Sequence, residues 1–176
     1  MEPFSERIVR VRQAYKEARA QFAARLRNAS EADAHRAGAD GGWSAAQIGW
    51  HVAAVDASFA AIVSGASPAA TPVPDGQSVR PWSEVAAGIP GKLDAGKRVR
   101  PPDDVRRDDV LALLADSEQK LDAALAALPE DRGSAFCITH PVIGMVAVGQ
   151  IGDWAAGHVL RHDAQAARVL GERSAT

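Results

Sequence analysis

Apolar residues recur at spacings of three and four in four stretches of the chain, and polar or charged residues fill the positions between them. This period is typical of an amphipathic helix with one face turned toward a core. The four stretches cover about 3–28, 44–65, 104–128 (or 108–128) and 146–170. The pattern therefore predicts an all-α protein, a four-helix bundle formed by a single domain over 1–176.

The second predicted helix has the best-defined ends. Ser44 is in position to be its N-cap, and Gln47 follows three residues later, as in an S-x-x-Q capping box. Trp43 and Ile48 flank the first turn and can form a hydrophobic staple. Gly65 is in position to end the helix, because many helices end at a residue in the left-handed conformation, which is usually glycine.

Three connections separate the predicted helices, and the second is the longest. Residues 66–103 contain seven of the ten prolines, and a short helix is expected there only near 83–87. A connection of this length is either functional or a crossover that spans the bundle. The third connection includes residues 133–144, which could be extended. Gly149 and Gly152 weaken the prediction for the start of the fourth helix.

Charge and cysteine content restrict the function. The 20 basic and 22 acidic side chains give a formal charge of −2, so no nucleic-acid partner is expected. No apolar run approaches the roughly 20 residues of a bilayer span, and the first residues are charged where a secretory signal would become apolar. A cytoplasmic protein without a membrane partner is therefore expected. The single cysteine, Cys137, excludes an internal disulfide and a cysteine-rich zinc site.

Three of the five histidines occupy positions from which they could meet. His158 and His162 are four residues apart on the fourth helix, so they differ by about 40° around the axis and about 6 Å along it. This spacing lets one helix offer two imidazoles to one metal ion. His51 lies on the apolar face of the second helix and points into the bundle. Packed or surface histidines are the alternative interpretation.

The spacing does not indicate a zincin. Val159 follows His158, whereas the H-E-x-x-H motif has a glutamate there as general base. If water is activated at this site, either the base lies elsewhere or the metal alone lowers the pKa of the water.

Three segments resemble the DinB/YfiT-like superfamily. WSAAQIGWH at 43–51 is similar to that family's W-S-x-x-[EQ]-[IVL]-x-x-H opening of the second helix. HPVIGM at 140–145 resembles its H-P-x-x-G-x segment, and HVLRHDAQ at 158–165 resembles its H-x-x-x-H-x-x-Q helix. One feature departs from the family: Met145, Val146 and Ala147 stand where it usually has a Thr or Ser cap.

The resemblance implies a four-helix bundle with a long crossover between its second and third helices. It also implies a divalent metal ion, commonly nickel or zinc, held by His51, His158 and His162, with open positions for water or a small-molecule substrate. Some relatives are S-transferases or isomerases that depend on mycothiol, bacillithiol or glutathione. Others are described as metal-dependent hydrolases, and many have no known activity.

Residues near the three histidines could take further roles. Ile151 and Trp154 precede His158 on nearly the same face and could form an apolar pocket wall, with ordinary bundle core as the alternative. Gln165 could hydrogen-bond a group behind the ligand histidines or a neighbouring helix, and Asp56 could accept a hydrogen bond from a ligand histidine and so orient it. Outside this group, His140 is expected at a pocket rim or in a structural role, His35 in solvent, and Cys137 without a nucleophilic role.

Three hypotheses of different classes follow. The first is a metal-dependent enzyme, either a hydrolase or a low-molecular-weight-thiol-dependent S-transferase or isomerase. The second is a non-catalytic bundle that binds a metal or a small ligand, and the third is a structural bundle with packed histidines. A homodimer formed through an exposed helix face is a further expectation.

Overall fold

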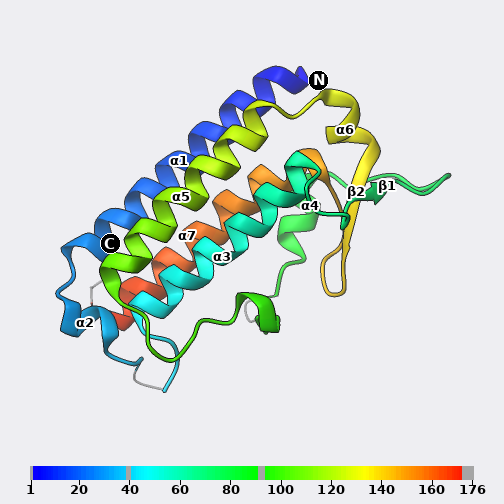
Figure 1. Ribbon diagram of the computed structural model, residues 1–176. Helices are drawn as coiled ribbons and strands as arrows, with labels where there is room; N and C mark the ends of the chain where they lie inside the picture. The colour runs from blue at the N-terminus through cyan, green and yellow to red at the C-terminus, as the bar shows by residue number, and fades with distance from the viewer. Residues whose placement is uncertain (1, 39–40, 91–93, 172–176) are drawn as a thin grey trace.

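The fold is a bundle of four long helices with a short hairpin at one end (Figure 1). It comes from a computed structural model, which describes residues 2–38, 41–90 and 94–171. The all-α four-helix prediction is confirmed. The bundle helices are α1 (Phe4–Asn28), α3 (Ala45–Ser64), α5 (Arg107–Ala126) and α7 (Ile151–Val169).

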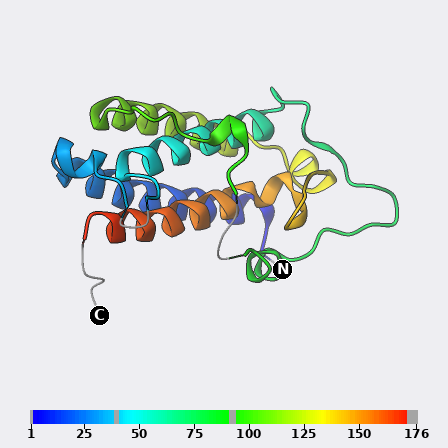
Figure 2. The same cartoon turned by 90° about the horizontal axis from the view of Figure 1, so that it is seen from below.

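The four helices surround one apolar core. α1 and α3 each lie beside α5 and α7, so they are diagonally opposed across the bundle. Seen from below, α5 and α7 run along opposite edges of the bundle (Figure 2). The core is filled by inward-facing residues of the predicted helical stripes. Its fully or almost fully buried members include Tyr15, Phe22, Ile48, Leu121 and Ile151.

Local sequence signals define the ends of α3. The Ser44 side chain accepts a hydrogen bond from the Gln47 backbone, while the Gln47 side chain accepts one from the Ser44 backbone, so the capping box is confirmed. Gly65 ends the helix at φ 84°, in the left-handed region that favours glycine. Among the described helices, α3 alone is long and apolar enough to span a membrane by length and composition, and 56% of its most apolar window is buried inside the bundle.

The predicted start of the fourth helix at 146 is wrong. Instead, β2 (Phe136–His140) and β3 (Gly144–Ala147) form an antiparallel hairpin that also pairs with β1 (Thr71–Pro72). A 3₁₀ turn, η2 (Val148–Gln150), leads into α7. The hairpin forms in place of a first helical turn because Gly144 turns the chain at φ 81°. The chain between Gly144 and Ala147 then pairs with β2.

The glycines that weakened the helix prediction permit close packing instead. A Cβ on Gly152 would lie 2.4 Å from Cγ1 of Val11 on α1, and a Cβ on Gly149 would lie 2.9 Å from the carbonyl oxygen of Gly133. Real Cβ atoms essentially never come this close, so glycine lets α7 approach α1 and lets η2 approach α6.

Two short helices occur where connections were expected. α2 (Glu31–His35) follows α1, and α6 (Glu130–Ala135) follows α5, which ends at Ala126 rather than at 128. α4 (Trp82–Ala87) lies where the short helix was expected. One- and two-turn helices carry too few periodic positions to be recognised from apolar spacing.

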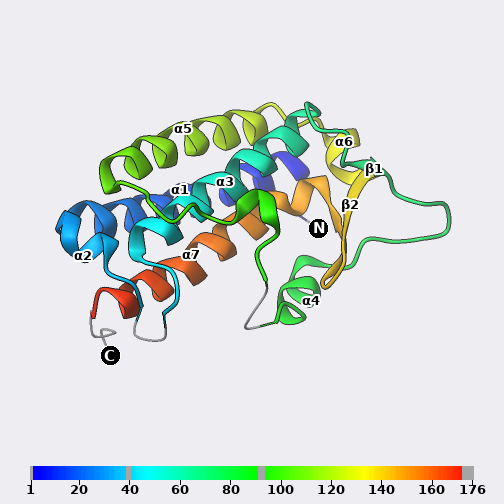
Figure 3. The same cartoon turned by 60° about the horizontal axis from the view of Figure 1, so that its bottom comes forward.

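The long connection between α3 and α5 is a crossover. It leaves α3 beside the hairpin, forms α4, and returns along the bundle through η1 (Lys97–Val99) to the far end, where α5 begins (Figure 3). η1 packs against α3, and the Gln47 side chain donates to the carbonyl oxygen of Pro102. The crossover therefore covers the α3–α7 face of the bundle. Residues 91–93 of the predicted connection lie outside the described residues.

Candidate functional site

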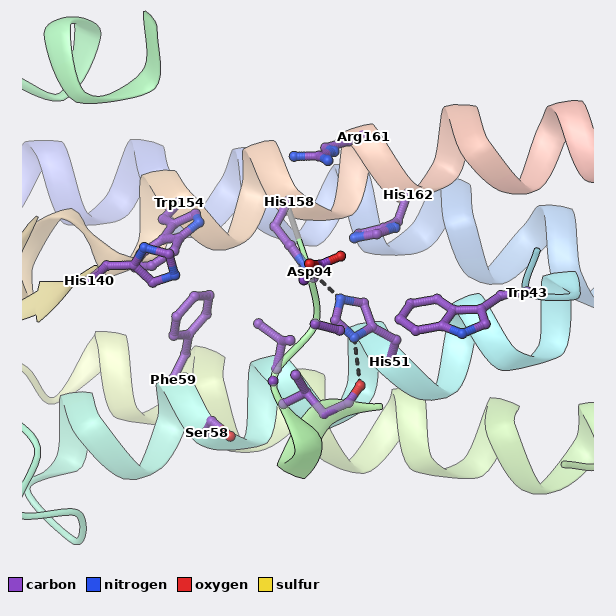
Figure 4. A pocket seen from close by; sticks show the side chains of 14 residues that line it. Trp43, His51, Ser58, Phe59, Asp94, His140, Trp154, His158, Arg161 and His162 are labelled. Carbon is purple, nitrogen blue, oxygen red and sulfur yellow. Dashed lines mark hydrogen bonds between the residues drawn. The ribbon is translucent and has the colours of Figure 1, made fainter. Parts of the chain in front are cut away.

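Three histidines from two helices meet beneath the crossover. His51 projects from α3, and His158 and His162 project from adjacent turns of α7 (Figure 4). Nε2 of His51 lies 3.2 Å from Nε2 of His158. One ring nitrogen of each histidine lies within 4.8 Å of those of the other two. The meeting expected from the i, i+4 spacing and the inward face of α3 is confirmed.

The crossover fixes the orientation of His51. Its Nδ1 lies 2.7 Å from the carbonyl oxygen of Val99, beside η1. A carbonyl oxygen only accepts, so Nδ1 carries the hydrogen and Nε2 keeps its lone pair toward the other two rings. Trp43 packs against the same imidazole, with ring centroids 5.0 Å apart. Nothing in the apolar period of the sequence pointed to Val99, because it lies in the long connection.

His162 is oriented in the same way from within α7. Its Nδ1 lies 2.8 Å from Oε1 of Gln165, which directs Nε2 at the cluster. Gln165 thus bonds a ligand candidate on its own helix, rather than a group behind the ligands or a neighbouring helix as expected. Nδ1 of His158 is buried and has no hydrogen-bond partner among the described residues.

Burial keeps the three rings neutral. Desolvation lowers the pKa of His51 below its usual value. It lowers the pKa of His158 much further, assisted by the neighbouring rings. The pKa of His162 falls to about 4, chiefly from burial and secondly from the nearby His51. Neutral imidazole is the form that binds a metal ion.

The donor set fits a divalent metal ion. A zinc–imidazole bond is about 2.0–2.1 Å long, so two ligand nitrogens of one tetrahedral ion are about 3.3 Å apart. The 3.2 Å between the His51 and His158 nitrogens is close to this separation. Metal-bound histidines usually donate their other N–H to an oxygen, as His51 and His162 do here. Three histidines leave open coordination positions, which is typical of catalytic rather than structural zinc sites.

The nearby α-helical carboxylates are engaged elsewhere. Asp153 pairs with Arg7, and Asp163 pairs with Arg25. Asp56 is fully buried, accepts a hydrogen bond from Tyr15 and lies 3.4 Å from Nε of Arg19. Burial raises the pKa of Asp56 to about 7. Its described partners are therefore a tyrosine and an arginine rather than a ligand histidine.

A cavity of about 260 Å³ opens beside the cluster. Trp154 lines it, as expected for a pocket wall, with its ring 4.9 Å from that of Phe59. Ile151 does not line it: this side chain is fully buried in the bundle core, so of its two interpretations the bundle core is confirmed and the pocket wall is wrong. The other wall and rim residues are Trp43, Val55, Ser58, Asp94, Ala95, Gly96, Val99, His140 and Arg161.

Several of these lining residues were not predicted as such from the sequence. Phe59 and Val55 share the apolar face of α3 with His51, which the helical period indicates, but the period does not separate the core from a cavity wall. Arg161 lies between the two α7 histidines in sequence. Asp94 comes from the irregular crossover, where no period indicates which way a side chain points. Its side chain lines the same cavity as the three histidines (Figure 4).

The remaining candidates lie where the sequence suggested. His140 is at the rim of the cavity, packed edge-on against Trp154. His35 pairs with Glu31 at the surface end of α2. Cys137 is buried in β2 and is not among the lining residues of the cavity.

Comparison with known protein families gives a match. The family model described as DinB superfamily matches residues 14–166. This range contains the three histidines and the segments at 43–51, 140–145 and 158–165. No curated protein and no solved structure matches the chain.

Proposed function

The chain belongs to the DinB superfamily, and from this premise we propose that it is a metal-dependent enzyme acting on a small molecule. In this proposal His51, His158 and His162 hold one divalent ion, nickel or zinc. The observation that carries it is the convergence of three neutral imidazoles beside a cavity. A structural bundle would have no need to bury three such rings against one another.

The chain's own residues would supply orientation and binding. The Val99 carbonyl and the Gln165 side chain hold His51 and His162 with Nε2 directed inward. Trp154 and Phe59 offer an apolar surface for the body of a substrate. Asp94 and Arg161 place one charge of each sign at the cavity. When bound, the metal would lower the pKa of a water molecule or a thiol so that it becomes a nucleophile near neutral pH.

Two reaction classes fit this arrangement. In hydrolysis, a bond forms from the water oxygen to an electrophilic carbon, and the leaving group departs with its electron pair and takes up a proton. In S-transfer, a bond forms from a thiol sulfur to such a carbon, and the bond from that carbon to the leaving group breaks, with its electron pair going to the leaving group. The thiol proton passes to the leaving group or to solvent. The buried position of Cys137 away from the cavity favours a thiol that arrives as a co-substrate.

The test begins with metal analysis of protein purified without chelators. One equivalent of nickel or zinc is expected, retained in His35→Ala as the control and lost in His158→Ala. The cobalt or nickel form is then titrated with mycothiol, bacillithiol or glutathione. A change in the d–d spectrum with one of them supports the thiol-dependent class, and no response counts against it. Metal bound without turnover of any substrate would favour a non-catalytic binding module.

A further inference from the structure

His140 has a fixed tautomer. Its Nδ1 accepts hydrogen bonds from the backbone N–H groups of Val142 and Ile143, at 3.2 and 3.3 Å. A ring nitrogen that accepts from two backbone donors carries no hydrogen, so in the neutral ring the hydrogen is on Nε2. Burial lowers the pKa of His140, which favours the neutral form.

The hairpin that carries His140 is braced on both sides. Arg80 donates to the carbonyl oxygen of Ile143 at 3.0 Å. The Gln150 side chain accepts from the backbone of Ala147 and donates to the backbone of Arg80. The turn that positions the imidazole is therefore tied to the crossover and to the start of α7.

The ring lies at the end of the cavity away from the histidine cluster. It packs edge-on against Trp154, with centroids 5.5 Å apart, and both rings lie above Phe59 in the view of Figure 4. Trp154 precedes His158 by four residues on α7, a separation of about 6 Å along the axis. A flat or short apolar group laid along Trp154 and Phe59 would thus extend from the cluster toward His140.

We propose that His140 is a specificity-determining residue whose Nε2–H donates a hydrogen bond to a carbonyl-type oxygen of the substrate. The substrate class is a small molecule with a reactive or metal-binding group at the histidine cluster, a short apolar or aromatic body, and a ketone, amide, ester or carboxylate oxygen at the far end. This inference rests on the proposed function. The cavity volume of about 260 Å³ lies just below the ~300–1,000 Å³ that ligand sites commonly measure, which restricts the substrate to a small molecule.

A purely structural role for His140 would be to cap its own turn through Nδ1. His140→Asn separates the two roles. The asparagine Oδ1 occupies the place of Nδ1 and can accept from the same two backbone donors, whereas no atom of the shorter side chain reaches the place of Nε2. Val142→Ala is the matched control, because it changes an exposed side chain of the same turn and keeps the backbone N–H.

The experiment uses cobalt-loaded protein and two aromatic thiols as probes. Benzenethiol and 4-mercaptobenzamide share a sulfur for the metal and a ring for the apolar wall, and only the second has an oxygen at the far end. The d–d and charge-transfer bands report binding. Comparing one probe between wild type and variant cancels differences in thiol acidity, and the two probes together form a double-mutant cycle.

We expect His140→Asn to lower the affinity for 4-mercaptobenzamide about five- to tenfold, which is the effect of losing one hydrogen bond. It should leave benzenethiol affinity, metal content and melting temperature unchanged, and Val142→Ala should bind both probes as wild type does. If His140→Asn lowers the affinity for both probes equally, or for neither, the proposed role of His140 is overturned while the metal site stands. No spectral response to either probe in any of the proteins overturns the proposed function and this inference with it.

A second measurement does not depend on the stability of the variant. In the metal-free wild type, ¹⁵N–¹H correlation spectra of the imidazoles should show His140 with its hydrogen on Nε2. In zinc-loaded protein, 4-mercaptobenzamide should shift the Nε2 resonance and benzenethiol should not. A hydrogen on Nδ1, or an Nε2 resonance that responds to neither probe, overturns the proposal.

Discussion

The pH dependence of stability in the metal-free protein reports directly on the burial of His162. This ring is 8% exposed, and its pKa falls from 6.5 to about 4. Because the folded pKa lies below the unfolded one, the unfolded chain binds the proton more readily. The stability contributed by the neutral ring is therefore complete above pH 6.5 and is lost as the pH falls toward 4.

The magnitude follows from the difference between the two pKa values. A fall from 6.5 to about 4, at ~1.4 kcal/mol for each tenfold change in proton affinity, amounts to about 3 kcal/mol. His51 and His158 add losses of the same sign, since burial lowers the pKa of both. Asp56 contributes with the opposite sign, because its folded pKa is raised.

The assay is urea unfolding of chelator-treated wild type and His162→Gln at a series of pH values between about 7 and 4. The contribution of Asp56 is common to both proteins and cancels in the comparison. We expect the wild type to lose about 3 kcal/mol more of its free energy of unfolding than the variant over this range. Equal losses in the two proteins would refute the placement of His162 as a buried neutral ring.

Three further predictions concern the core and the metal. Tyr15→Phe removes the 2.7 Å hydrogen bond to buried Asp56 and should lower the free energy of unfolding by about 1–3 kcal/mol in urea titrations; an unchanged midpoint would contradict the placement of this pair. Gly152→Ala puts a Cβ 2.4 Å from Val11 and should destabilise by about 1–3 kcal/mol. A Cβ at Gly157 on the same helix would meet nothing within 4 Å, so Gly157→Ala should raise the free energy of unfolding by roughly 0.5–1 kcal/mol. A change in the free energy of unfolding of the same sign in both variants would argue against the close α1–α7 approach. Nickel or zinc at a hundredfold excess over its Kd should raise the free energy of unfolding by about 2.7 kcal/mol, reversibly with a chelator and not in His51→Ala; an equal rise in that variant would place the ion elsewhere.

The parts of the fold set by long periodic patterns could be predicted from the sequence. The stripe of Ile8, Tyr15 and Phe22 on α1 and the capping box at Ser44 each act locally, and both are present in the structure. The start of α7 could not be found in the same way. Residues 144–147 are apolar enough for either state, and their pairing with β2 decides the outcome through contacts that a helical period does not encode.

In the candidate site too, the residues placed by a helical period could be predicted and those placed by the crossover could not. His158 and His162 are brought together by one turn of one helix, so their spacing indicates the contact. For His51, its position on the apolar face of α3 was enough to predict that the side chain points into the bundle. Val99 and Asp94 were not accessible to such reasoning, because the crossover places them by its path over the bundle. Ile151 and Trp154 share one helix face that serves both the core and the cavity, so spacing alone left the core and pocket-wall interpretations open for both residues.

X-ray absorption at the metal edge of the nickel- or zinc-loaded protein tests the central claim most directly. We predict a first coordination shell containing three imidazole nitrogens, at about 2.0–2.1 Å for zinc. His51→Ala, His158→Ala and His162→Ala should bind the ion only when it is supplied in excess, and each should then show one imidazole fewer. A shell without imidazole scattering, or one that is the same in all three variants as in wild type, would contradict the assignment of the metal to these histidines.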